Sequence, residues 1–211
     1  MTKLVLASTS PARLRLLKDG GIDPIVIAPG VDEELVADMA MQAGQIGNTA
    51  DLVLLLAKAK AEAVVNHPDA QDALIIGCDS SLDLDGESLG KPHDPEVAIE
   101  RWKAMNGRSG RLYTGHWLID NRAGTSNPPA NGKATNTKVH FAELSDSEIL
   151  AYVGTGEPLK VAGAFTIDGL GGAFIRAIEG DAHTVVGLSL PTLRELCIGL
   201  GVDYPSLWRS N

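Results

Sequence analysis

The chain has 211 residues, of which 44% are hydrophobic and 4% aromatic, and its formal net charge is −9 at pH 7. A chain of this length can bury a substantial core, and we expect residues 1–211 to form a single domain with two lobes. The negative charge argues against stable nucleic-acid binding, which rests on Lys and Arg, but a small anion could still bind a local basic pocket. No apolar run approaches the ~20 residues of a membrane-spanning helix, and the N-terminus lacks a signal-peptide pattern, so we expect a cytoplasmic protein outside any membrane.

The opening of the chain predicts a strand that runs directly into a helix. Residues 3–7 favour a strand, and the Ser-Pro pair that follows is typical of a helix start, so we expect a helix over 11–19. Unpaired N–H groups and the positive end of the dipole make a helix N-terminus a seat for anions. Ser8 and Ser10 add donors, and Arg13 can curl back towards the turn. We predict that this turn holds phosphates; the alternative is an ordinary turn with a solvated arginine.

Three carboxylates follow the second predicted strand. Residues 25–28 favour a short strand, which leads through Pro29-Gly30 to the run Asp32-Glu33-Glu34. Taken alone, such a run is typical of a solvated acidic loop at a turn.

Residues 49–66 predict a long amphipathic helix. Its predicted buried stripe comprises Leu52, Leu55, Leu56, Ala59 and Ala63. At roughly 100° per residue, Lys60 lies on the flank of this stripe and Lys58 nearly opposite it. We expect Lys60 to reach into the protein beneath the helix and Lys58 to be solvated. The structural alternative for Lys60 is an edge lysine that extends back to solvent.

Residues 74–79 form a continuous apolar run that ends in Asp79. Such runs are typical of strands buried on both faces, and ligands of open α/β sheets bind outside the carboxyl ends of the strands. Asp79 therefore stands where chemistry is expected, although an Asp that caps the next turn is the alternative. Residues 82–84 lead to a hairpin at Asp85-Gly86, and its return strand presents Lys91 as a cation at a strand end.

The rest of the chain continues an α/β pattern. We expect, in order, a helix over 95–105, a strand over 111–120, a surface loop over 121–134, a strand over 135–144, a helix opened by the capping box Ser145-Asp-Ser-Glu148 and ending at Val153, strands over 162–167 and 173–178, a short apolar segment over 185–188 and a helix over 191–199. Cys78 and Cys197 lie in separate apolar segments, which indicates buried thiols and no disulfide.

Acidic and basic side chains both fall at the ends of predicted elements. The acids are Glu33, Asp79 and Asp168, and the cations are Arg13, Lys60 and Lys91. If the elements converge, the cations would bind the oxygens of a polyphosphate and the carboxylates would hold Mg²⁺ or Mn²⁺. Cleavage of a phosphoanhydride needs positioning, charge neutralisation and an oriented water, which a metal and a carboxylate base supply.

Short motifs stand in order along nearly the whole chain: Leu-Ala-Ser-Thr-Ser-Pro-Ala-Arg13, Val-Asp-Glu33, Ala-Lys-Ala-Lys60-Ala, Gly-Cys-Asp79-Ser, Leu-Gly-Lys91-Pro, Tyr-Thr-Gly115, Glu157-Pro, Ala-Gly163-Ala-Phe and Val-Val-Gly-Leu188. Together they resemble the Maf family of nucleoside triphosphate pyrophosphatases, first described as septum-formation inhibitors. The resemblance implies an α/β fold with an elongated mixed β-sheet flanked by helices, two lobes and a central cleft, as in inosine triphosphate pyrophosphatases. It also implies a homodimer that uses a divalent metal to hydrolyse a nucleoside triphosphate to the monophosphate and diphosphate.

The resemblance also implies roles for single residues. Ser8 and Arg13 match the family's phosphate-binding turn, and Lys60 and Lys91 match its phosphate-binding lysines. Glu33 and Asp79 match its metal-binding and water-activating carboxylates, with the role of proton acceptor on Asp79. The task implied for such an enzyme is the removal of modified or non-standard nucleotides.

Three positions depart from the family members that act on dTTP and UTP. Those members carry two adjacent arginines where this chain has Ala12 before Arg13, a Lys at the position of Val161, and a Gln at the position of Asp168. An ionised Asp only accepts hydrogen bonds, so Asp168 would suit a base that presents N–H donors, or it would not contact the base. The resemblance therefore leaves the preferred base open.

Two other functions remain as alternatives. The first is a nucleotide-sensing regulator of cell division that binds nucleotides with little turnover. The second is a purine-directed enzyme of the inosine triphosphate pyrophosphatase type.

Overall fold

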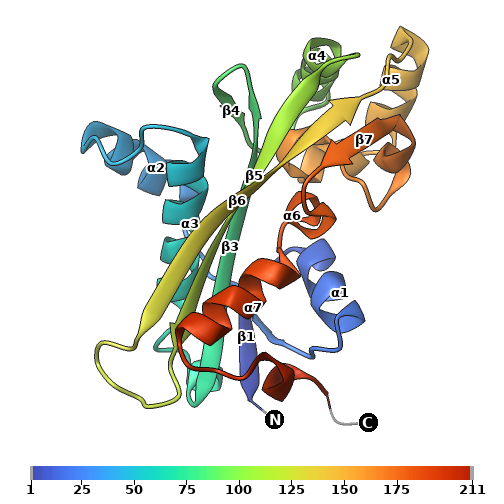
Figure 1. The fold of residues 1–211 in the computed structure, drawn as a ribbon. Coiled ribbons are helices and arrows are strands. Elements are labelled where there is room, and N and C mark those ends of the chain that lie inside the picture. The colour runs from blue at the N-terminus through green and yellow to red at the C-terminus, as the bar shows by residue number, and fades with distance from the viewer. Residues whose placement is uncertain (1, 210–211) are drawn as a thin grey trace. The chain divides into compact units, whose positions relative to one another are not determined.

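The structure, a computed structural model, describes residues 2–209 and contains a mixed sheet with helices packed against it (Figure 1). The strand order of this seven-stranded sheet is β2-β1-β3-β5-β6-β7, and β4 pairs with β3. The strands are β1 (Lys3–Ala7), β2 (Ile25–Ile27), β3 (Ala73–Leu84), β4 (Glu87–Leu89), β5 (Ser109–Asp120), β6 (Ala130–Phe141) and β7 (Ile175–Glu179). The α-helices are α1 (Pro11–Asp19), α2 (Glu33–Gln42), α3 (Thr49–Ala63), α4 (Pro95–Met105), α5 (Asp146–Gly154), α6 (Ala182–Val186) and α7 (Leu190–Gly199). None of the helices within 2–209 is both long and apolar enough to cross a bilayer.

The chain divides into two compact units. Within the described residues, unit 1 comprises 2–79, 114–135 and 187–209, and unit 2 comprises 80–113 and 136–186. Strands β3, β5 and β6 contribute residues to both units.

Three parallel strands form the start of the sheet in unit 1. Ala7 at the end of β1 pairs with Ile27 on one side and with Gly77 on the other. Strand β3 continues beyond this level, so Asp79 lies two residues past the end of β1. From β1 the chain crosses first to β2 and later back to β3, which makes the gap between β1 and β3 a topological switch point, where open α/β sheets bind ligands.

Helices cover both faces of the sheet in unit 1, and strand alternation sorts the side chains between them. One face packs against α1 and α7, and its buried set includes Leu4, Leu6, Leu74, Ile76, Cys78, Leu17 and Leu193. The other face packs against α3, and its set includes Val5, Ala7, Ala73, Ile75, Ile119 and Ala61. Because successive side chains of a strand point to opposite faces, Asp79 shares the parity of the α3 face.

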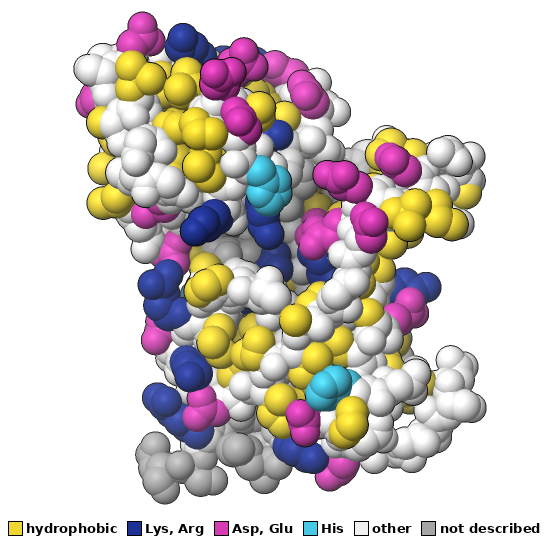
Figure 2. Space-filling model, turned by 180° about the vertical axis from the view of Figure 1, so that it is seen from behind, with side chains coloured by type: hydrophobic (Ala, Val, Ile, Leu, Met, Phe, Trp, Pro, Cys, Tyr) yellow, Lys and Arg dark blue, Asp and Glu magenta, His cyan; other side chains and the backbone are white. Residues whose placement is uncertain are grey.

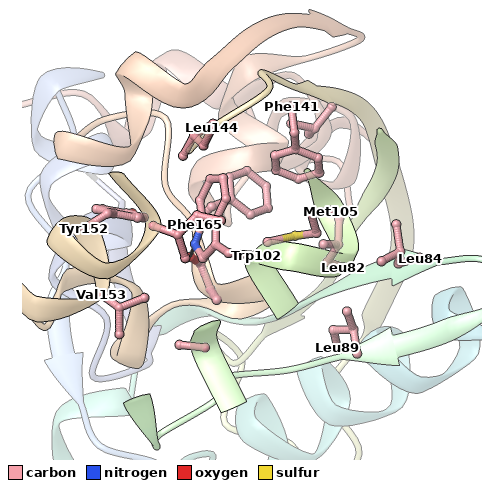
Figure 3. Close-up of a cluster of buried hydrophobic side chains, with 14 of the residues drawn as sticks. Leu82, Leu84, Leu89, Trp102, Met105, Phe141, Leu144, Tyr152, Val153 and Phe165 are labelled. Carbon is pink, nitrogen blue, oxygen red and sulfur yellow. Dashed lines mark hydrogen bonds between the residues drawn. The ribbon is translucent and has the colours of Figure 1, made fainter. Parts of the chain in front are cut away.

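Unit 2 has its own aromatic core (Figure 3). The three phenylalanines of the chain, Phe141, Phe165 and Phe174, all belong to this cluster or pack against it. The indole of Trp102 makes edge contacts with Tyr152, Phe141 and Phe174 at centroid distances of 5.4, 5.8 and 5.9 Å. Trp102, Phe141 and Tyr152 are labelled in Figure 3. The Nε1 of Trp102 donates to the carbonyl oxygen of Ala164 at 2.8 Å. The core is thus apolar, and the indole N–H of Trp102 within it has a hydrogen-bond acceptor.

Most predicted elements are confirmed. The strand over 3–7 and the helix over 11–19 have the predicted bounds, the hairpin forms at Asp85-Gly86, and the Ser145 capping box opens α5. Helices α4 and α7 begin within one residue of their predicted starts. Both cysteines are free and buried, as predicted.

Several predictions about local structure were wrong. The acidic run at Asp32 opens a helix, α2, with Asp32 as its N-cap. Strand β6 begins at Ala130 inside the predicted loop, because the neighbouring strand β5 imposes pairing on a Gly- and Asn-containing segment. Residues 162–167 form no strand, since Gly163 and Ala164 have φ values of 66° and 61°. The prediction of a short apolar segment over 185–188 is not contradicted: its first two residues belong to α6, and Leu188 is buried.

The predicted buried stripe of α3 was wrong except at Leu56. The buried residues of α3 are Thr49, Val53, Leu56, Ala57, Lys60 and Ala61. Lys60 therefore lies within the buried face of the helix, whereas Lys58 is exposed as predicted.

Candidate active site

Lys60 carries an ammonium group that contacts two carboxylates. Its Nζ lies 2.6 Å from Asp79 Oδ1 and 2.8 Å from Glu33 Oε1. The Lys60 and Asp79 side chains are 7% and 11% exposed, whereas that of Glu33 is 45% exposed. Two of the three charges, those of Lys60 and Asp79, are thus largely buried. Salt screens buried charges only weakly. We call Glu33, Lys60 and Asp79 the carboxylate–lysine cluster.

Each member of the cluster is positioned by a local feature of unit 1. Asp79 lies buried in the middle of β3 and contacts Lys60 of α3. Lys60 stands one turn after Leu56 on the buried stripe of α3. Glu33 is the first residue of α2, whose N-cap, Asp32, accepts a hydrogen bond from Leu35 N at 3.0 Å. An N-cap Asp followed by acids in the first turn is a helix-start signal that the sequence does contain.

The turn between β1 and α1 holds a buried arginine. Arg13 Nη1 donates to Ser8 Oγ at 3.1 Å, and Arg13 Nε donates to the Gly187 carbonyl oxygen at 2.7 Å. Ser8 Oγ also accepts from the Ser10 backbone N–H at 3.2 Å. Because the Ser8 oxygen already accepts two hydrogen bonds, its O–H is the group that can donate to a ligand. The Arg13 side chain curls back to the turn as predicted, and the solvated-arginine alternative was wrong.

A buried histidine fixes the segment that provides the Gly187 carbonyl. His116 Nε2 accepts from the Ser189 backbone N–H at 2.8 Å, so this nitrogen is unprotonated and the ring proton is assigned to Nδ1, which lies 3.3 Å from the Lys133 carbonyl oxygen. Ser189 in turn caps α7. Sequence reasoning missed the roles of His116 and Gly187, although the Val-Val-Gly-Leu188 motif contains the latter.

The Ser8–Arg13 turn and the carboxylate–lysine cluster both act electrostatically on Cys78 of β3. Burial raises the pKa of the Cys78 thiol to about 12, while the positive charges of Arg13 and Lys60 lower it and the charge of Asp79 raises it. All three charged groups therefore act on one buried thiol of unit 1. At neutral pH this thiol is protonated and is no nucleophile.

Lys91 belongs to unit 2, where its backbone is held in place. It is exposed and follows Gly90, whose carbonyl oxygen accepts from the Arg101 guanidinium and from the Gly163 backbone N–H. A Cβ at Gly163 would lie 2.6 Å from the Leu82 Cβ, and the φ of 66° also favours glycine. Gly163 thus explains part of the Ala-Gly163-Ala-Phe motif: it ties down the strand end that carries Lys91.

Asp168 also belongs to unit 2 and is exposed. Its carboxylate accepts a hydrogen bond from the Thr166 hydroxyl. The segment that follows is held by Glu157, whose carboxylate accepts from Leu170 N at 3.0 Å and from Gly171 N at 2.9 Å. The Glu157-Pro motif therefore has a structural function in unit 2, which sequence reasoning did not assign.

The donor set of the carboxylate–lysine cluster suits a hard divalent cation. Among residues 2–209 no group of three or more His, Cys, Asp or Glu side chains forms a metal cage. The cluster offers two carboxylates, and Mg²⁺ is commonly bound by one or two carboxylates together with phosphate oxygens and waters. Glu33 and Asp79 are therefore chemically able to hold such a cation in the presence of a phosphate ligand.

Comparisons with known proteins identify the family of this chain. A family model described as Maf-like protein matches residues 3–199. A protein from Leifsonia xyli subsp. xyli named nucleoside triphosphate pyrophosphatase is 53% identical over 209 residues, covering 98% of this chain and 96% of that protein. A protein of the same name from Nostoc punctiforme is 49% identical and covers 97% of both chains. A solved structure titled nucleoside-triphosphatase / dITP/XTP pyrophosphatase, from Mycobacterium abscessus, matches 68% of this chain and 76% of its own at 14% identity, with a TM-score of 0.38. The family model and the closely similar sequences show that this chain belongs to the Maf family.

Proposed function

We propose that this protein is a metal-dependent nucleoside triphosphate pyrophosphatase, which hydrolyses the bond between the α- and β-phosphates to give a nucleoside monophosphate and diphosphate. The observation that carries the proposal is the carboxylate–lysine cluster of unit 1, in which two carboxylates contact one buried ammonium, together with the Ser8–Arg13 turn that follows the neighbouring strand β1. The names of the similar proteins support the same reaction.

We assign a different role in the reaction to each residue of the unit 1 site. The Arg13 guanidinium, the Ser8 hydroxyl and the N-terminus of α1 would bind phosphate oxygens, and Lys60 would neutralise their charge. Asp79 would orient the attacking water and accept its proton. A divalent cation held by Glu33 and Asp79 would supply further charge neutralisation for the triphosphate. In unit 2, Lys91 would be a further phosphate ligand and Asp168 a candidate contact for the base.

The test is a product analysis with a panel of natural and modified nucleotides and Mg²⁺ or Mn²⁺. Formation of one diphosphate per monophosphate supports the proposal, and the panel also reports the preferred base. Release of orthophosphate would contradict it. Tight nucleotide binding with negligible hydrolysis would favour the regulatory alternative instead.

We also propose that the protein is a cytoplasmic homodimer without stable nucleic-acid binding. Apolar side chains are exposed on α2, to the right in Figure 2, and they include Leu35, Met39 and Met41 at 55, 63 and 54% exposure. Exposed apolar surface of this kind supports contact with another protein surface. Sedimentation equilibrium would show the dimer, and a monomer at micromolar concentration would contradict it.

A further inference from the structure

Lys60 and a divalent cation would compete for the same pair of carboxylates. The Lys60 ammonium lies at hydrogen-bond distance from both Glu33 and Asp79. A cation bound to either carboxylate would lie about 2.0–2.6 Å from an oxygen, and hence within a few ångströms of the ammonium. Like charges at such separations in a partly buried site repel strongly. The pair of carboxylates therefore cannot serve both positive groups equally well.

The burial of Lys60 makes this competition effective. Its side chain is 7% exposed and lies on the buried face of α3, so its ammonium cannot simply turn into bulk solvent. By contrast, Lys58 on the same helix is exposed. Its Nζ lies 3.8 Å from Glu62 Oε1 and 5.2 Å from the centroid of the Trp117 ring. Lys58 and Lys60 thus offer a matched pair, one lysine in the cluster and one outside it.

We propose that Lys60 is an internal counter-ion that keeps divalent cations off the Glu33–Asp79 pair until a triphosphate draws its ammonium away. This inference rests on the proposed function, since it assumes that a polyphosphate binds beside the cluster. A lysine has a flexible stem and a single ammonium, so a small movement transfers it from a carboxylate to a phosphate oxygen. The two carboxylates then become available when phosphate oxygens can complete the coordination of the cation. Cation and nucleotide would therefore bind synergistically, and each would bind weakly without the other.

The experiment measures Mn²⁺ binding to the protein without any nucleotide, by isothermal titration calorimetry or by the EPR signal of free Mn²⁺. The variant is K60Q, which removes the positive charge and keeps an amide able to donate to one carboxylate. We expect K60Q to bind Mn²⁺ about tenfold more tightly than the unaltered protein. K58Q, the matched control, should bind Mn²⁺ as the unaltered protein does. The double variant K60Q/D79N should lose the gain, which would locate the cation at the cluster.

Thermal unfolding gives a second readout that does not depend on activity. K60Q leaves two neighbouring carboxylates without their ammonium, so it should unfold at a lower temperature, and Mn²⁺ should raise its Tm more than that of the unaltered protein. If K60Q does not fold, the same measurements of Mn²⁺ binding and Tm are made on K60M, which also removes the positive charge. Equal or weaker Mn²⁺ binding by the folded variant, or an equal Mn²⁺ effect on Tm, would overturn the inference.

The product assay keeps the two proposals separate. Tighter Mn²⁺ binding by K60Q in a protein that hydrolyses no nucleotide would support the counter-ion and refute the proposed function. Hydrolysis by the unaltered protein, with no gain of Mn²⁺ affinity in K60Q, would refute the counter-ion alone.

Discussion

The carbonyl oxygen of Ala57 lies so close to Gly77 that a Cβ added at Gly77 would come within 2.2 Å of it. Gly115 on β5 is approached in the same way, with 2.1 Å between its added Cβ and the Val53 carbonyl oxygen. These two contacts set the depth at which α3 packs on β3 and β5. Because α3 carries Lys60, the same contacts bring its ammonium within reach of Asp79.

Substitution G77A should therefore disturb both stability and the carboxylate–lysine cluster. The new methyl group meets backbone atoms that cannot move aside, and we expect a loss of about 1–3 kcal/mol in the free energy of unfolding. Urea denaturation measures this loss. The control is G154A, where an added Cβ meets nothing within 4 Å. Equal stability of the two variants would show that α3 does not depend on the close approach.

Substitution D79N tests the proposed role of Asp79 in orienting water. An amide cannot accept the proton of the attacking water, so kcat should fall by about 10²-fold or more. Steady-state diphosphate release measures kcat, and circular dichroism verifies that the variant is folded. D69N, at a carboxylate that is 66% exposed, should retain full activity. A near-normal kcat for folded D79N would remove Asp79 from the mechanism.

Substitution R13K tests the geometry of the Ser8–Arg13 turn, which is the proposed phosphate site. Arg13 Nη1 donates to Ser8 Oγ, and Arg13 Nε donates to the Gly187 carbonyl oxygen. A lysine keeps the charge but lacks the planar fork, and we expect kcat/KM to fall at least ~10-fold. R15K, at an exposed position of the same helix, is the control. Comparable kcat/KM values for the two variants would mean that charge alone suffices at position 13.

The Glu157 carboxylate predicts an acid-dependent loss of stability in unit 2. Burial raises the pKa of Glu157, but hydrogen bonds from the Gly171 and Leu170 N–H groups and the Tyr152 hydroxyl outweigh it, and the pKa is lowered overall. A carboxylate whose pKa is lower in the folded state stabilises the fold above its unfolded pKa, roughly 4.3, and this contribution is lost as the pH falls through the folded pKa.

Urea unfolding from about pH 7 down to about pH 3 tests this carboxylate. E157Q should be less stable at neutral pH and should show a weaker pH dependence in the acid range, because its amide does not titrate. E62Q, at a side chain that is 54% exposed, is the control and should follow the unaltered protein. Parallel pH profiles for E157Q and the unaltered protein would exclude Glu157 as the titrating group.

Local chemistry in the sequence determined many elements and most residue types of the site. The Ser-Pro start of α1, the Ser145 capping box and the Asp85-Gly86 hairpin are short-range signals, and each works because its hydrogen bonds close within a few residues. The family motifs likewise point to Arg13 and Lys60 by their positions in the chain alone. Helix α2 carried a readable N-cap signal that the acidic run obscured.

Only the tertiary structure decided which face of α3 is buried and which groups meet around β3. Apolar residues occupy most of the circumference over 52–63, so stripes other than the predicted one also fit the sequence. The close approach of α3 to Gly77 decides which face is buried. The Gly187 carbonyl and the His116 ring lie far from Arg13 in sequence. Their contacts exist only because β5, which is separated from β1 by β3, packs into one core cluster with α1 and α7. Long-range packing fixes such contacts, and no local pattern encodes them.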